Sequence, residues 1–175
     1  MKKQDISENL VKIVYLSLGS NLGNRVNNLE KAKYLLNSNE VKITKSSKYY
    51  ETSSWPNKKF PKFLNIVIEA NTYLKINSLY HLIKIIEKRL GRKKTPKNYP
   101  RTCDIDIIDY DQKVKSINLN NIKIEIPHPR MHERNFVLIP LFEISKNWNH
   151  PNFNHKISKL LSNINNNELR SIKII

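Results

Sequence analysis

Two aspartates that lie two residues apart, Asp104 and Asp106, are the first candidates for chemistry in this sequence. Alternate side chains of a β-strand share a face, so the segment TCDIDIID predicts both carboxylates on one face, with Cα atoms about 6.5–7 Å apart. Hard divalent cations such as Mg²⁺ prefer oxygen ligands of this kind. A D-x-D pair is a weak motif that also fits an ordinary solvated strand face, so the spacing alone leaves both interpretations open.

Five neighbouring residues alternate with the aspartate pair and therefore have the opposite parity in a strand. Cys103, Ile105 and Ile107 are predicted to point into the core, and Cys103 has no evident general-base partner. Asp109 and Asp111 lie beside a predicted turn and are predicted to be solvated. The two candidate ligands therefore reduce to Asp104 and Asp106.

Basic residues flank the aspartate pair on both sides, and carboxylates for a metal among guanidinium groups are typical of a nucleotide polyphosphate site. In a chain this basic, a solvated face is the simpler interpretation of most of them. The basic residues and histidines in question are Arg89, Arg92, Lys93, Lys94, Lys97 and Arg101 before the pair, and His128, Arg130, His132 and Arg134 after it.

Glycine-rich phosphate loops are absent, because the sequence contains only Gly19, Gly23 and Gly91 and neither a Walker A nor a dinucleotide-binding motif. If the protein binds a nucleotide, side chains must hold the phosphates. His128 and His132 have a zinc-like spacing, but the neighbouring prolines disfavour a helix and a third ligand is not evident.

Composition bounds the class of protein. The chain has 175 residues with a formal net charge of +16, which attracts anions, although abundant Lys, Asn and Ile also fit compositional drift. A length of this order predicts one domain, here over residues 11–175 after a polar extension over residues 1–10. One cysteine, no apolar leader and no apolar run of about 20 residues predict a cytoplasmic protein that does not enter a membrane.

Hydrophobic periodicity predicts the order β-α-β-β-α-β, which is an α+β, ferredoxin-like sandwich with an extra C-terminal hairpin and helices. Asn77 or Ser78 is predicted to cap the second helix and Gly91 to end it. The second and third strands are predicted to pair antiparallel. The predicted strands are 12–18, 41–52, 62–74 and 102–109, with one or two more in 115–127, and the predicted helices are 24–36, 79–90, 136–144 and one near Leu160.

Several segments, taken together and in order from about Val14 to Ile144, resemble 6-hydroxymethyl-7,8-dihydropterin pyrophosphokinases of folate biosynthesis. The paired segments PRTCDIDI and PHPRMHERNFVLIPL carry most of the specificity, and the others are YLSLGSNLGNR, YYETSSW, FLNIVIEA and IEKRLGR. The resemblance implies a monomeric enzyme in which the pterin hydroxymethyl oxygen attacks the β-phosphorus of ATP and AMP leaves. It also implies two Mg²⁺ ions bridged by Asp104 and Asp106.

The resemblance assigns further residues to the two substrates. Arg92 and Arg101 are expected to be catalytic through the ATP phosphates. The expected ATP side comprises Glu87, Arg92, Lys94, Arg101, Ile107, His128 and Arg134, and the expected pterin side comprises Thr52, Ser53, Trp55, Phe63, Asn65 and Phe136. The segment Ser53–Pro61 departs from the family pattern, since it is short and rich in lysine, and Lys94 stands where an arginine is common.

Two other function classes fit parts of the sequence. A nucleic-acid-binding module would use the positive charge and scattered aromatic residues, but Asp104 and Asp106 would be out of place on a surface that faces phosphates. A divalent-metal nuclease would use the D-x-D pair, but a third acidic ligand is not evident. We therefore expect ATP and a dihydropterin as partners, and no nucleic acid.

Overall fold

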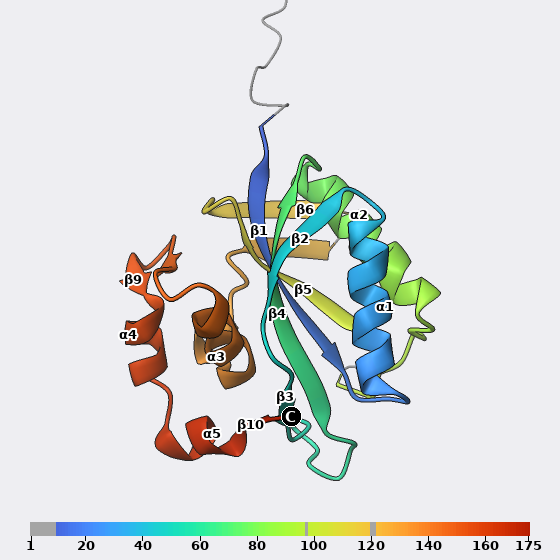
Figure 1. Ribbon diagram of the computed structural model, residues 1–175, viewed down its shortest axis with the longest axis vertical. Coiled ribbons are helices and arrows are strands. Elements are labelled where there is room, and N and C mark those ends of the chain that lie inside the picture. The colour runs from blue at the N-terminus through green and yellow to red at the C-terminus, as the bar shows by residue number, and fades with distance from the viewer. Residues whose placement is uncertain (1–9, 97, 120–121) are drawn as a thin grey trace, which may run out of the picture.

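The computed structural model describes residues 10–96, 98–119 and 122–175 (Figure 1). The predicted polar extension over residues 1–10 lies outside the described residues except for Leu10, which is exposed. No helix among the described residues combines the length and the apolar character needed to cross a bilayer.

An antiparallel sheet of six strands forms the centre of the described fold. Its order is β10–β3–β4–β1–β5, and β2 pairs with β4 next to β3. Each strand therefore runs against its neighbours, as the ferredoxin-like prediction requires. The strands are β1 (Lys12–Ser20), β2 (Val41–Ser46), β3 (Tyr50–Thr52), β4 (Phe63–Thr72), β5 (Asp104–Tyr110) and β10 (Lys173–Ile174).

Helices cover both faces of this sheet (Figure 1). On one face, α1 (Arg25–Asn37) and α2 (Ile76–Arg89) bury a core that includes Leu16, Ile66 and Ile105. On the other face, α3 (Asn135–Ile144) and α4 (Ile157–Ser162) pack against Tyr15 and Ile108. The βαββαβ unit and the added C-terminal elements together confirm the predicted α+β class.

The remaining elements extend this unit at its edges. The predicted extra hairpin is present as β6 (Lys115–Leu119) paired with β7 (Ile122–Ile126). A 3-10 helix, η2 (Met131–Glu133), precedes α3, a short pair β8 (Asn149–His150) and β9 (His155–Lys156) precedes α4, and α5 (Asn166–Ser171) follows it. The predicted helix boundaries at 24–36 and 136–144 agree with α1 and α3 to within one residue.

The predicted strand over 41–52 is wrong as a single element, because the structure divides it into β2 and β3. Three residues, 47–49, lie opposite two residues of β4 in the register, so the ladder is interrupted. The Ser47 hydroxyl oxygen accepts a hydrogen bond from the Val67 N–H at 3.0 Å, and Glu143 accepts one from the Lys48 N–H. Side chains thus satisfy backbone groups that the ladder leaves free.

The start of α2 also differs from the prediction. The helix begins at Ile76 after Lys75 as its N-cap residue, so neither Asn77 nor Ser78 caps it. Gly91 follows the C-cap residue Leu90 with φ of +83°, the left-handed conformation predicted for the residue that ends this helix.

Asp109 is buried, which makes the predicted solvated position wrong. In the β1–β5 pairing, Leu16 lies opposite Ile107 and Tyr15 lies opposite Asp109, so Ile108 is an extra residue in β5. This bulge shifts the alternation by one residue, so that Asp109 Oδ2 accepts a hydrogen bond at 2.8 Å from the indole of Trp148, which follows α3 in the chain. Burial raises the pKa of Asp109 above its ordinary value.

Candidate active site

A cavity of about 450 Å³ lies where β5 meets the loop that follows α2 and the segment that precedes α3. Seven of the residues predicted at the sequence level line it. They are Arg92, Lys94, Arg101, Asp104, Asp106, His128 and Arg134, and they are joined by Lys93, Thr95, Pro96 and Asn98.

The first strand residues of β5 place both carboxylates in this cavity. Asp104 and Asp106 share a strand face, as the alternation predicts, and both line the cavity. Cys103, Ile105 and Ile107 are buried in the core that α1 and α2 cover. The strand therefore divides its residues between core and cavity, as expected for residues 103–107.

Arg92 and Arg101 enclose the carboxylate of Asp104. Arg92 Nη1 donates a hydrogen bond to Asp104 Oδ1 at 2.5 Å, and Arg101 Nη2 donates one to Asp104 Oδ2 at 2.5 Å. Burial acts to raise the pKa of Asp104, but the two guanidinium groups outweigh it and hold that pKa below its ordinary value. Asp104 is therefore ionised across the neutral range.

Glu87 does not line the cavity, but it accepts a hydrogen bond from Arg92, which does. Arg92 Nη1 also donates to Glu87 Oε1, and the same oxygen accepts a hydrogen bond from the Ile105 N–H at 2.8 Å. Burial raises the pKa of Glu87, while Lys84 and Arg92 oppose that rise. Glu87 thus ties the end of α2 to β5 and orients Arg92 toward Asp104.

Asp106 is more open than Asp104, with 37% of its side chain exposed. Arg134 Nη1 donates to Asp106 Oδ2 at 3.3 Å, and His128 Nε2 lies 4.0 Å from the same oxygen. Burial lowers the pKa of His128, and Asp106 opposes that effect. Arg134 and His128 therefore both lie beside the second carboxylate of the cavity.

Two aromatic rings predicted on the pterin side contact the arginines of the cavity. The guanidinium carbon of Arg101 lies 5.4 Å from the centre of the Phe63 ring, and that of Arg134 lies 5.5 Å from the centre of the Phe136 ring. These are cation–π distances. Phe63 and Phe136 come from the start of β4 and from α3, so residues distant in sequence meet around β5.

Asn65 and Thr52 form a buried polar pair beside Phe63. The Asn65 amide donates to Thr52 Oγ1 at 3.0 Å and to the Tyr50 carbonyl at 3.4 Å. In the sheet, Gly19 lies opposite Asn65 on one side and opposite Asp104 on the other. Strand β1 therefore places Asn65, on the predicted pterin side, and Asp104, a predicted metal ligand, at the same position along the sheet.

The other predicted residues lie further from the cavity. Ser53 is exposed, and Trp55, 66% exposed, contacts Arg130, whose guanidinium carbon lies 5.5 Å from the centre of the indole ring system. Ile107 is buried in the core and does not line the cavity. The structure thus brings the phosphate-side residues together, and leaves Trp55 on a loop that reaches the segment before α3.

Asn21 is a residue that sequence reasoning missed. It is 1% exposed and hydrogen-bonds to the backbone of Arg101 and to the loop that contains Ser54. Its signal in the sequence is its place directly after a predicted buried strand, in the segment GSNLGNR, which is one of the segments that resemble the family.

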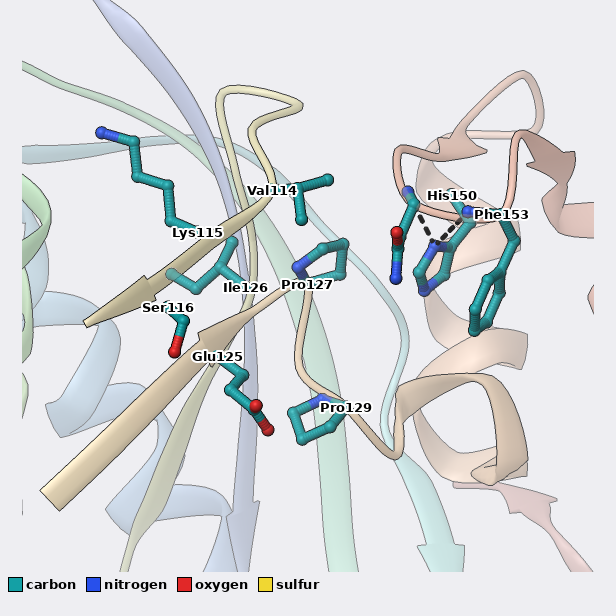
Figure 2. Close-up of a pocket in the computed structure, with 10 residues that line it drawn as sticks. Val114, Lys115, Ser116, Glu125, Ile126, Pro127, Pro129, His150 and Phe153 are labelled. Atoms are coloured by element: carbon teal, nitrogen blue, oxygen red, sulfur yellow. Dashed lines mark hydrogen bonds between the residues drawn. The ribbon is translucent and has the colours of Figure 1, made fainter. Parts of the chain in front are cut away.

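A second cavity of about 300 Å³ contains none of the predicted site residues (Figure 2). Pro127 and Pro129 line it, whereas His128 between them lines the first cavity. Its other walls come from the β6–β7 hairpin and from the segment with His150 and Phe153, whose rings stack at 4.2 Å. The paired carboxylates and the arginines therefore belong to the first cavity alone.

The donor set of the first cavity fits a metal-bound polyphosphate. Mg²⁺ is usually held by one or two carboxylates together with substrate phosphates and waters, and two carboxylates are what the cavity provides. No cluster of three His, Cys, Asp or Glu side chains that could hold a metal occurs among the described residues. Arg101 Nε is buried and has no hydrogen-bond partner in the described part of the chain, so it retains a donor for an anion.

The fold and the cavity define an α+β protein with a site suited to a polyphosphate. The model of the 7,8-dihydro-6-hydroxymethylpterin-pyrophosphokinase family matches residues 15–146. The 2-amino-4-hydroxy-6-hydroxymethyldihydropteridine pyrophosphokinase of Bacillus subtilis is 40% identical over 133 residues, which cover 75% of this chain and 77% of that protein. The chain belongs to the 7,8-dihydro-6-hydroxymethylpterin-pyrophosphokinase family.

Longer relatives match as well. The folic acid synthesis protein fol1 of Pneumocystis carinii is 36% identical over 168 residues, 95% of this chain, but the chain spans only 22% of that protein. A crystal structure of Plasmodium falciparum HPPK-DHPS superposes with a TM-score of 0.76 at 18% identity and covers 98% of this chain and 48% of that one. That likeness concerns the fold. Membership of this family lends no support to the nucleic-acid-binding or nuclease alternatives.

Proposed function

We propose that this protein transfers a pyrophosphoryl group from ATP to the hydroxymethyl oxygen of 6-hydroxymethyl-7,8-dihydropterin, as a step of folate biosynthesis. A bond forms between that oxygen and the β-phosphorus, the bond from the β-phosphorus to the oxygen it shares with the α-phosphorus breaks, and AMP leaves. The observation that carries the proposal is the cavity in which Arg92 and Arg101 enclose Asp104, in a chain of this family.

Positioning and charge are the protein's contribution to such a transfer, because little covalent chemistry falls to the enzyme. Arg92 and Arg101 bind the phosphates, and Glu87 orients Arg92. Lys94, His128 and Arg134 complete the ATP side, with Ile107 behind it near the adenine. These roles are supported by the cavity that seven of the predicted residues share.

Asp104 and Asp106 are the residues that would hold Mg²⁺, and we propose two ions. When bound, they would neutralise the triphosphate and orient the attacking oxygen. Arg92, Arg101 and Arg134, which donate to the two carboxylates in this structure, would then be able to donate to phosphate oxygens.

The pterin is proposed to bind between the Phe63 and Phe136 rings. Asn65 and Thr52 hydrogen-bond its edge, and Ser53 and Trp55 come from the loop above it. Support comes from the two cation–π contacts, which bring both rings next to arginines of the ATP side. Residues 11–175 act as a single catalytic domain in this proposal, as a monomer, in the cytoplasm where ATP is supplied.

The test is direct. The protein is incubated with ATP, Mg²⁺ and 6-hydroxymethyl-7,8-dihydropterin, and nucleotide products are separated by chromatography. AMP that forms only when the pterin is present is the expected result. ADP in its place would indicate an ordinary kinase, and the absence of pterin-dependent AMP would refute the proposal.

A further inference from the structure

Asn21 follows the last residue of β1 and is buried although it lies in a loop. A buried amide needs partners for its carbonyl oxygen and for its NH₂ group. Both groups of Asn21 are satisfied, and the partners belong to two different loops.

The first partner is the backbone of Arg101. Asn21 Oδ1 accepts a hydrogen bond from the Arg101 N–H at 2.8 Å, and the Asn21 N–H donates to the Arg101 carbonyl at 3.1 Å. Both backbone groups of Arg101 are thereby held by one residue. This fixes the point from which the Arg101 side chain reaches Asp104 and Phe63.

The second partner is the loop between β3 and β4. Asn21 Nδ2 donates to Ser54 Oγ at 3.2 Å and to the Pro61 carbonyl at 3.2 Å. The Ser54 hydroxyl in turn donates to the Pro61 carbonyl at 2.5 Å. These bonds close the two ends of the loop that carries Trp55 against the end of β1.

We propose that Asn21 is a positioning residue that holds the ATP-side backbone at Arg101 and the pterin-side loop at Ser54–Pro61 in one fixed relation. The inference rests on the proposed function, because it takes the two sides to be the two substrate sides. Asn21 itself lines neither cavity, so it acts through Arg101 and Ser54. A displacement of about 1 Å at such a point lowers turnover by roughly 100-fold.

Two substitutions of Asn21 separate its two connections. Asn21→Ala removes the three side-chain hydrogen bonds to Arg101, Ser54 and Pro61 and leaves only the backbone bond to the Arg101 carbonyl. We expect kcat to fall roughly 10- to 100-fold, with higher KM values for ATP and for the pterin. Asn21→Asp keeps the acceptor for the Arg101 N–H but replaces the donor that faces Pro61. The KM for the pterin should then rise while the KM for ATP stays near the wild-type value, a split that a general loss of stability would not produce.

Asn39→Ala is the matched control. The Asn39 amide donates to the Leu35 carbonyl at 2.7 Å at the opposite end of α1, so the substitution removes a comparable bond far from both loops. Wild-type kinetics are expected for it. Wild-type kinetics for Asn21→Ala, or equal effects of Asn21→Asp on both KM values, would overturn the inference, whereas a wild-type protein without pterin-dependent AMP formation would overturn the proposed function instead.

Tryptophan fluorescence provides a readout that does not depend on turnover. Trp55 is exposed on the loop and Trp148 is buried. A Trp55→Phe variant identifies the part of the fluorescence emission that comes from Trp55. Adding ATP with Mg²⁺ is expected to change the Trp55 emission in the wild-type protein and to leave it unchanged in Asn21→Ala. No change in the wild-type protein, or the same change in both proteins, would contradict the proposal that Asn21 connects the ATP side at Arg101 to the loop that carries Trp55.

Discussion

The guanidinium group of Arg101 donates a hydrogen bond to the carboxylate of Asp104, three residues further along the chain, at 2.5 Å. The same guanidinium group lies against Phe63. The proposed phosphate ligand therefore contacts one proposed metal ligand and one proposed pterin-stacking ring at once. A single side chain links the three components of the reaction, and its replacement should affect all of them.

Arg101→Ala should lower kcat by roughly 10²- to 10³-fold, because a charged donor to the transferring group is lost in a partly buried site. Arg101→Lys should recover only part of this loss, since lysine lacks the planar fork that donates to two acceptors. Steady-state AMP formation measures both. Arg89→Ala, which removes an exposed arginine outside the cavity, serves as the control, and wild-type turnover in Arg101→Ala would contradict the phosphate role.

Asp104→Ala and Asp106→Ala should each abolish turnover and leave the fold intact. Asp106 is partly exposed and its partner Arg134 is 3.3 Å away, so its ion pair should contribute only about 0–1 kcal/mol to stability. Thermal unfolding should therefore distinguish the two variants, with the larger loss in Asp104→Ala, where Arg92 and Arg101 face each other without their shared partner. Asp111→Ala is the control, and unchanged rates in the first two variants would remove the metal assignment.

Gly19→Ala should weaken pterin binding more than ATP binding. A Cβ atom at this position would lie 3.1 Å from Asn65 Oδ1 and 3.5 Å from Phe63 Cδ1, so the Asn65 side chain must move while Phe63 remains in ordinary contact. The KM for the pterin is expected to rise by roughly tenfold, as the loss of one well-aligned hydrogen bond of about 1.4 kcal/mol would produce. Equal KM values in the variant and the wild-type protein would show that Asn65 does not contact the substrate.

His150 should make stability depend on pH below neutrality. Burial, followed by the charges of His132 and His155, lowers its pKa from 6.5 to about 4. Between those two pH values the unfolded chain binds a proton at His150 and the folded protein does not. The free energy of unfolding is therefore unaffected by His150 above about pH 6.5 and decreases as the pH falls toward 4. At about 1.36 kcal/mol for each pKa unit, the free energy of unfolding decreases by about 3 kcal/mol over this range.

The His150→Asn variant tests this dependence. Asparagine offers an acceptor in place of His150 Nδ1, which accepts from the N–H groups of Asn152 and Phe153 at 3.3 Å, but it does not titrate. Urea unfolding between pH 4 and 7 should show a smaller slope of unfolding free energy against pH in the variant. Parallel curves for the two proteins would assign the pH dependence to other groups.

Local pattern predicted much of the fold because periodicity and parity depend on neighbouring residues. The helices over 24–36 and 136–144, the terminating Gly91 and the shared face of Asp104 and Asp106 all follow from spacings within a few residues. The interrupted strand at 47–49 and the bulge at Ile108 did not, because each depends on the register with another strand. Because of this register, Asp109 is buried in the structure, although the sequence predicted it to be solvated beside a turn.

The sequence by itself determined the chemistry available to this protein: two carboxylates on one strand face, arginines without a glycine-rich loop, and a set of segments sufficient to indicate the family. Only the tertiary structure decided which residues meet. It placed Arg92 and Arg101 on either side of Asp104, Phe63 and Phe136 beside separate arginines, and Asn21 between two loops. The physical reason is that contacts between residues far apart in the chain arise from sheet order and loop packing, which no local spacing encodes.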